Sequence, residues 1–306
     1  MLRHIWGQTL SAVPLRWRSM QLGALLPQIE IGPLPADIAA FSTAAEDAGF
    51  EFLQAYEHVV GVDTSQRLQW AGPYDVTNQF HEPLVLFGYL AALTSMALVT
   101  GVLVLPQRDA VLVAKQAAEV DLLCGGRLRL GVGIGWNQVE VEALGATFAD
   151  RAARCEEQIS VLRALWTQDV VRLHGRWHQL DGVGILPRPV QRPIPLWMGG
   201  WAPAALDRIG RLADGWIAMA RPGGGLEESW ATVTEAAARA GRPAGSVGLH
   251  GTVEPGPELD DAKLRRQVER WRAAGATHVA VSGMQGGRSP AEHVEFIRRA
   301  GTALFS

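Results

Sequence analysis

Short apolar runs alternate with longer amphipathic stretches along most of the chain. Apolar runs of about four to eight residues are typical of buried strands, and an apolar stripe with a 3.6-residue period is typical of a surface helix. Eight strands are predicted, at residues 20–26, 52–56, 98–105, 129–132, 195–198, 215–219, 247–250 and 278–281. Eight helices are predicted between and after them, at residues 37–48, 84–94, 111–123, 154–166, 203–212, 226–240, 260–274 and 290–303.

This rhythm predicts an α/β fold of parallel strands joined by helical crossovers. Eight units favour a single-domain (β/α)8 TIM barrel over residues 20–306. The alternative is a doubly wound sheet, but residues 131–135 read G-x-G-x-G rather than G-x-G-x-x-G, and residues 136–138 do not open a helix cleanly. Residues 1–19 are predicted to be an N-terminal extension, because they lack the apolar core of a signal peptide.

Glycines and two long segments refine this prediction. Gly49, Gly125, Gly241 and Gly275 follow helical stretches, where a left-handed residue ends a helix at least cost. Long insertions are expected after the second strand, at residues 60–82, and between the fourth helix and fifth strand, at residues 169–192. The second insertion is predicted to hold a hairpin of residues 170–173 and 177–180, and the first to cover the active face.

Composition narrows the class of partner. The formal charge of −3 argues against a nucleic acid or an anionic membrane, since both require a concentrated basic surface. A small-molecule partner and a cytoplasmic protein are expected, with Cys124 and Cys155 as packing residues. No His/Cys cluster has zinc spacing, so no metal site is expected.

Polar and glycine residues follow several predicted strands, at the edge where barrel enzymes build their active sites. Glu57-His58 ends the second strand, and one of the two could orient the other. Gly199-Gly200 ends the fifth strand just before a predicted helix, whose free amides and dipole could hold a phosphate. The bare backbone of residues 131–136 could lie against a flat ring. The alternative at each glycine is an ordinary tight turn.

Nine motifs in this order resemble the luciferase-like monooxygenase superfamily, particularly its F420-dependent oxidoreductases. They are AAEDAGF (44–50), Glu57-His58, GVLVLPQR (101–108), LVAKQ (112–116), GGRL (125–128), GVGIGW (131–136), LRALWT (162–167), WMGG (197–200) and ADGW (213–216). The match covers most of residues 20–216 and is less distinctive beyond residue 241.

The resemblance implies a flavin or deazaflavin ring in the barrel mouth, with its phosphate at Gly199-Gly200. Glu57 would contact the cofactor, and His58 would act near the reactive carbon as a proton donor or a stabiliser of charge. A cis peptide is implied at Gly101-Val102. The implied cofactor site comprises Glu57, Gly101, Val102, Gly133, Gly135, Trp136, Gly199, Gly200 and Trp201. The expected substrate pocket comprises Gln28, Trp70, Tyr74, Phe80 and His81.

The expected activity is hydride transfer between coenzyme F420 and a small organic substrate. One alternative is an FMN-dependent monooxygenase that receives reduced flavin from a separate reductase, because one fold hosts both chemistries. A further alternative is a barrel that binds flavin without turnover. Trp136 stands where related sugar-phosphate dehydrogenases have a catalytic glutamate, so a sugar-phosphate substrate is not implied. Relatives of this kind are frequently homodimers.

Overall fold

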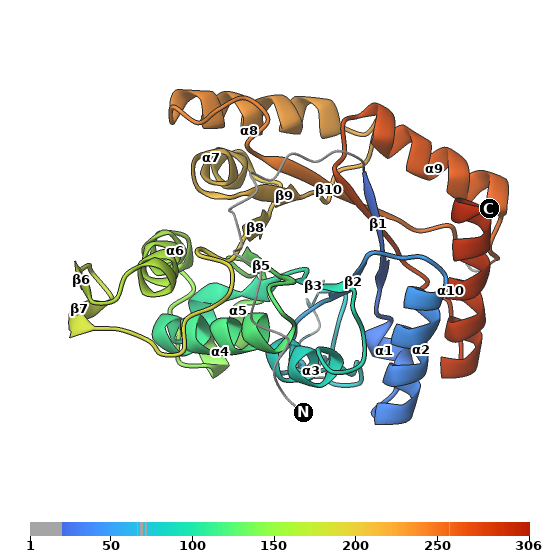
Figure 1. Cartoon of the computed structure of the whole chain (residues 1–306), viewed down its shortest axis with the longest axis horizontal. Coiled ribbons are helices and arrows are strands. Elements are labelled where there is room, and N and C mark those ends of the chain that lie inside the picture. Colours follow the sequence, from blue (N-terminus) through green and yellow to red (C-terminus); the bar gives the residue numbers. More distant parts are fainter. Residues whose placement is uncertain (1–19, 66, 68–69, 71, 257) are drawn as a thin grey trace, which may run out of the picture.

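The central feature of the computed structural model is a closed parallel barrel (Figure 1). The structure describes residues 20–306 except 66, 68–69, 71 and 257, so the predicted extension at residues 1–19 lies outside the described residues. Within these residues, nine strands form one sheet in the order β3-β2-β1-β11-β10-β9-β8-β5-β4, which the β3–β5 pairing closes. A doubly wound sheet stays open at two edges. The TIM barrel prediction is therefore confirmed.

The strands lie close to their predicted positions. They are β1 (Gln21–Leu25), β2 (Phe52–Ala55), β3 (Ala97–Thr100), β4 (Leu103–Val104), β5 (Leu128–Gly133), β8 (Leu196–Gly199), β9 (Gly215–Ile217), β10 (Gly248–Val253) and β11 (His278–Val281). All their pairings are parallel. Since β3 and β4 both pair with β5 and share one position, the nine strands make an eight-membered barrel.

The single strand predicted at residues 98–105 is wrong, because the chain divides it at Gly101-Val102. The amide of Gly101 still donates to the Ala55 carbonyl, with an N···O distance of 2.8 Å that is typical of a backbone hydrogen bond. Val102 then turns inward and packs on two glycines, so that a Cβ on Gly133 would lie 2.6 Å from its side chain and one on Gly199 3.1 Å. The peptide bond between Gly101 and Val102 is cis, as the resemblance implies.

Helices cover the outside of the barrel (Figure 1). The long ones are α2 (Pro35–Asp47), α3 (Pro83–Leu90), α4 (Ala110–Leu123), α6 (Arg151–Thr167), α7 (Pro203–Leu212), α8 (Leu226–Arg239), α9 (Asp261–Ala273) and α10 (Pro290–Phe305). Gly49, Gly125, Gly241 and Gly275 have φ values of 96°, 66°, 72° and 83°, which confirms them as left-handed helix ends. In the described part of the chain, no helix is long and apolar enough to cross a membrane.

Three short helical segments were not predicted, namely α1 (Gln28–Ile31), η1 (Leu105–Gln107) and α5 (Gln138–Ala143). Residues 136–138 were expected not to open a helix cleanly, but α5 begins at Gln138. The side chain of Asn137 accepts a hydrogen bond from the Glu140 amide at 3.2 Å and so caps α5. This cap sets where α5 begins and so places Glu140 in the first turn of the helix.

The predicted hairpin is present as β6 (Val171–His174) and β7 (Gln179–Val183), which pair antiparallel between α6 and β8. It projects from the barrel at the left of Figure 1. The carboxylate of Glu157 on α6 holds its turn, accepting hydrogen bonds from the amides of Arg176, Trp177 and His178 at 2.7, 2.9 and 2.7 Å. The hairpin is thus fastened to α6 rather than to the barrel mouth.

A polar cluster fills the barrel near the N-terminal ends of its strands. Arg129 of β5 lies 5.0 Å from the ring centroid of Trp197 and 5.4 Å from that of Phe52. His250 and His278 belong to the same layer, with ring centroids 6.2 Å apart. Burial, and then the charge of Arg129, lowers the pKa of His250 to about 3 and also lowers that of His278. Both imidazoles are therefore neutral at physiological pH.

Candidate functional site

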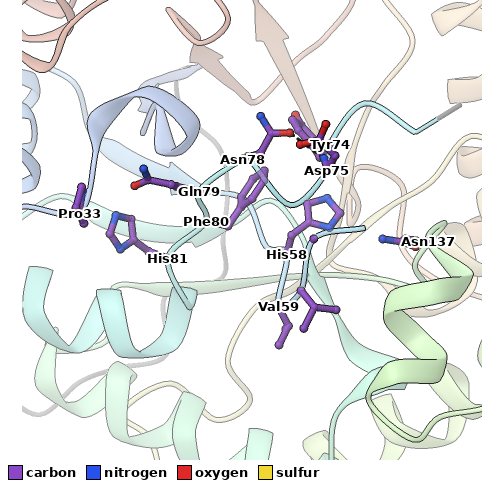
Figure 2. A pocket seen from close by; sticks show the side chains of 12 residues that line it. Pro33, His58, Val59, Tyr74, Asp75, Asn78, Gln79, Phe80, His81 and Asn137 are labelled. Carbon is purple, nitrogen blue, oxygen red and sulfur yellow. Dashed lines mark hydrogen bonds between the residues drawn. The ribbon is translucent and has the colours of Figure 1, made fainter. Parts of the chain in front are cut away.

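His58 lies three residues beyond β2, at the C-terminal edge of the barrel, and borders a pocket of about 390 Å³. Figure 2 shows its imidazole beside the rings of Phe80 and Tyr74, with His81 toward one end of the pocket and Asn137 toward the other. The lining residues are Pro33, His58, Val59, Val60, Gly61, Tyr74, Asp75, Asn78, Gln79, Phe80, His81 and Asn137. Most of the wall therefore comes from the long segment between β2 and α3.

The imidazole of His58 is held from behind by a carboxylate. Its Nδ1 lies 2.8 Å from Oε2 of Glu140, the third residue of α5. Among the described residues, no group bonds to Nε2 of His58. Because the acidic partner accepts the Nδ1 proton, Nε2 is the nitrogen available to a ligand in the pocket.

Glu140 is a buried acceptor at which several donors meet. Besides His58, the amide of Val59 donates to its Oε1 at 2.6 Å, and the side chains of Gln107 and Asn137 approach at 3.5 and 3.4 Å. Burial alone would raise the pKa of Glu140, but the hydrogen bonds from His58 and Val59 outweigh it and hold that pKa below its usual value. Glu140 thus stays ionised and fixes the orientation of the His58 ring.

Glu57 is buried and does not line this pocket. Its Oε1 accepts from Nε of Arg108 at 2.7 Å and also from Nη2, and its Oε2 accepts from the amide of Val104 on β4. Arg108 also pairs with Glu82 at 2.8 Å. Burial raises the pKa of Glu57 to about 7, although Arg108 and the Val104 amide act in the opposite direction. Glu57 therefore fastens β4, the strand that follows Val102.

Aromatic rings surround His58 on its open side. Their centroids lie 4.8 Å away for Phe80, 5.1 Å for Tyr74 and 5.7 Å for Trp136. Trp136 in turn contacts Trp70 of the β2–α3 segment, with centroids 5.6 Å apart. The structure thus brings three predicted residues around His58 and places a fourth, Trp70, against Trp136, so that the segment after β2 packs against the end of β5.

Two further predicted pocket residues shape the wall in different ways. Gln28 is fully buried and does not line the pocket. Its carboxamide donates to the Tyr56 carbonyl at 2.6 Å and accepts from the His81 amide at 3.0 Å. His81 does line the pocket, and its Nε2 lies 3.2 Å from the Gly32 carbonyl oxygen. Gln28 therefore braces the strand end and the loop that carries His81.

The predicted cofactor glycines gather on the other side of the mouth, at the ends of β5 and β8. Gly133 and Gly199 lie against Val102, and neither leaves room for a Cβ without displacing that side chain. Gly200 is held by the indole of Trp216, whose Nε1 donates to its carbonyl at 2.9 Å. The turn continues through exposed Trp201 to Ala202, which precedes α7 and provides no side-chain cap.

Sequence reasoning did not identify Glu140. The local signal was present, since Asn137-x-x-Glu140 is the spacing of a helix N-terminus. The spacing alone does not reveal that the carboxylate turns toward His58, 82 residues away. Among the described residues, no group of three or more His, Cys, Asp or Glu side chains could hold a metal ion.

Three comparisons show what the chain is similar to. It is 41% identical over 139 residues to an uncharacterised protein of Mycobacterium tuberculosis, a match to 45% of this chain and 48% of that protein. It is 31% identical over 174 residues to the FMNH2-dependent dimethylsulfone monooxygenase of Pseudomonas putida, covering 56% of this chain and 45% of the relative. The matches thus span about half the length of these curated relatives.

A solved structure with the same fold is the F420-dependent secondary alcohol dehydrogenase in complex with an F420–acetone adduct. Its TM-score is 0.74 at 18% sequence identity, and the alignment covers 94% of this chain and 99% of that one. The family model for luciferase-like monooxygenases matches residues 20–302, nearly the whole described chain. This protein therefore belongs to the luciferase-like monooxygenase family.

Proposed function

We propose that this protein transfers a hydride between coenzyme F420 and a small organic substrate bound beside His58. The observation that carries the proposal is the His58–Glu140 pair, which presents one imidazole nitrogen to the pocket. Hydride transfer to a carbonyl requires a proton at the oxygen in the same event. A positioned imidazole supplies such a proton, typically for a gain of about 10²–10⁴ in rate.

The residues on the glycine side fit a phosphate-bearing flavin or deazaflavin. Since Gly133 and Gly199 have no side chains, Val102 packs directly on their backbone, and a bound ring would meet Val102 on this side of the mouth. The first turn of α7 has no side-chain cap at Ala202, which supports a phosphate at its amides. Gly199, Gly200 and Trp201 would hold this end, and Gly101, Val102, Gly133, Gly135 and Trp136 would border the ring.

Reduced F420, when bound, supplies the hydride that converts a carbonyl carbon into an alcohol carbon. The imidazolium of His58 gives its Nε2 proton to the oxygen, and the ring regains that proton from solvent. Two electrons and two hydrogens thus reach the substrate, and the reverse direction uses His58 as the base. Glu140 keeps Nδ1 occupied throughout, so the ring cannot present the wrong nitrogen.

Glu57 plays a supporting part in this proposal. Both of its oxygens are engaged by Arg108 and the Val104 amide. Its direct contact with the cofactor stays a prediction. By anchoring β4, the Glu57 carboxylate would fix the position of Val102 beside a bound ring.

A second candidate is an FMNH2-dependent monooxygenase supplied by a separate reductase. The 31% identity to the dimethylsulfone monooxygenase of Pseudomonas putida favours it. The phosphate site would be the same, because FMN also carries a phosphate, and His58 would again face the substrate. Oxygen consumption that depends on both reduced FMN and substrate would support this alternative.

We also propose that two copies pair through the outer face of α3 and α4. Val85, Leu112 and Leu123 are each more than half exposed on these neighbouring helices. Lys115 and Glu119 lie on the same face of α4, so a second copy related by a two-fold axis would meet complementary charges. Light scattering of the purified protein should give the mass of a dimer, and Leu112→Glu should give a monomer.

The proposal is tested by titrating the purified protein with F420 and FMN in parallel, each oxidised and reduced, while tryptophan fluorescence is followed. Selective binding of F420, followed by its substrate-dependent oxidation, supports hydride transfer. Selective binding of reduced FMN supports the monooxygenase. Binding without turnover for any substrate, equal in the wild type and His58→Ala, would favour the non-catalytic barrel.

A further inference from the structure

The wall of the His58 pocket carries little charge, and that charge is negative. Among the described residues that line it there is no lysine or arginine. Its carboxylate is that of Asp75, whose pKa is lowered by hydrogen bonds from the hydroxyl and amide of Thr77. A second carboxylate, Glu254, acts on the pocket from outside the lining: burial and then its charge raise the pKa of Tyr74, which keeps that phenol neutral.

The guanidinium of Arg108 is already paired and is not free to meet a ligand anion. Arg108 follows η1, and its side chain is shared between Glu57 and Glu82. A ligand anion would have to compete with two carboxylates for it. Because a buried anion without a cation loses its hydration and gains little in return, the pocket disfavours carboxylate, sulfonate and phosphate groups.

The remaining wall combines rings with neutral polar groups. Tyr74 and Phe80 meet edge to face with centroids 4.9 Å apart, and both contact the His58 ring. Rings arranged in this way offer faces and edges to a flat apolar group. Gln79 adds a carboxamide at the exposed rim. His58 is paired with the Glu140 carboxylate, so the ring and its partner together present no net positive charge to a ligand anion.

We infer that the substrate of this site is an uncharged molecule that joins a flat, apolar group to a carbonyl or hydroxyl oxygen directed at His58. This inference rests on the proposed function, in which the pocket is the substrate site. It excludes the anionic substrates that an arginine-lined pocket would select. The oxygen, rather than an ionic group, then provides the orientation.

Three probes of almost equal size isolate the effect of charge: benzamide, benzoate and benzamidinium. Each is titrated into the full-length protein by calorimetry at pH 7.5. We expect benzamide to bind at least tenfold more tightly than benzoate and more tightly than benzamidinium. Tyr74→Ala should weaken benzamide binding several-fold, which assigns the probe to this pocket.

Gln79→Lys provides the matched charge change at the rim. It should strengthen benzoate binding at least threefold and weaken benzamidinium binding. Equal or tighter binding of benzoate by the wild type would overturn the inference, as would a preference for benzamidinium or binding of none of the three. None of these results bears on the F420 titration, so failure here and failure of the hydride-transfer proposal can be told apart.

Discussion

Nδ1 of His58 lies 2.8 Å from Oε2 of Glu140, although the two residues are 82 positions apart in the chain. One comes from the loop after β2 and the other from α5, which follows β5. The contact joins two sides of the barrel mouth. It also determines which imidazole nitrogen faces the pocket, and therefore which atom can exchange a proton with a ligand.

Glu140→Gln should lower kcat about tenfold to a hundredfold while the Kd for cofactor changes less than about twofold, because the amide can donate to Nδ1 and so allow the wrong tautomer. The pH profile of kcat should shift with it. Steady-state kinetics across pH 5–9 and ¹⁵N spectra of the His58 ring measure both effects.

Glu142→Gln is the matched control, since Glu142 lies on the same helix, is exposed and has a carboxylate that bonds only to Gln138 in the described structure. It should leave kcat unchanged. The double variant His58→Ala with Glu140→Gln should be no slower than His58→Ala alone, because Glu140 acts through that ring. Fully additive losses would show that Glu140 acts independently of His58.

Arg108→Met should destabilise the fold by about 3–5 kcal/mol, because it leaves Glu57 buried without a counter-charge. Burial raises the pKa of Glu57 to about 7, so a proton can relieve part of this cost. The loss should therefore be smaller at pH 6 than at pH 8. Urea unfolding at both pH values measures it.

Arg172→Met is the control for that change, because Arg172 forms an ion pair with Asp181 in which both side chains are mostly exposed. Its cost should stay below about 1 kcal/mol. If the two arginine variants lost equal stability, the Glu57–Arg108 pair would not be the fastening of β4 that its geometry indicates.

The cluster of Arg129, His250 and His278 predicts a loss of stability in acid. Burial, and then Arg129, lowers the pKa of His250 to about 3, and the pKa of His278 moves the same way. Below about pH 6.5 the unfolded chain binds protons that the folded chain does not. Stability should therefore be full above that pH and fall toward pH 3, by up to about 1.4 kcal/mol per pH unit for each histidine.

His250→Gln removes one of the two histidines that bind a proton when the chain unfolds in acid, and it keeps a similar side-chain volume. The free energy of unfolding should therefore fall less steeply with decreasing pH. Denaturant unfolding at pH 7.5, 6, 5 and 4 measures the slope. His174→Gln, at an exposed hairpin position, should leave the slope unchanged. If the free energy of unfolding changed equally with pH in His250→Gln and the wild type, protonation of His250 would not contribute to the loss of stability in acid.

Ala202→Asp separates the stability of α7 from its ability to bind a phosphate. Ala202 has the extended backbone of a helix N-cap, φ −68° and ψ 146°, but no capping side chain. An aspartate there should stabilise the fold by about 1 kcal/mol and weaken F420 binding at least tenfold, because its charge repels the phosphate. Thermal unfolding and fluorescence titration measure the two effects.

Ala202→Asn supplies the same cap without the charge and should cost less affinity than Ala202→Asp. Normal F420 affinity in the aspartate variant would mean that the phosphate binds elsewhere. Equal losses in both variants would assign the effect to occupied amides rather than to charge.

The sequence predicts the barrel well because each strand is buried and each helix has one apolar stripe, and these properties appear in the local pattern. The break at Gly101-Val102 is not visible in that pattern, since residues 102–105 are all apolar and read as a continuous strand. The resemblance, rather than the periodicity, indicates the special geometry there.

The site was predicted only in part, for a related reason. His58, Tyr74, Phe80 and His81 do meet in one pocket. Glu140 was missed because a contact between two loops depends on the closed barrel and leaves no mark on nearby sequence. Gln28 was expected in the pocket, but its carboxamide is directed to the carbonyl of Tyr56, to which it donates.

The most direct test of the central claim is single-turnover oxidation of bound reduced F420 by an uncharged ketone, followed by absorbance in wild type and His58→Ala. We predict that the wild type binds reduced F420 in preference to reduced FMN and oxidises it when the ketone is added. His58→Ala should bind it equally well and react at least a hundredfold more slowly. Binding of reduced FMN alone, or equal rates in the two proteins, would contradict the account.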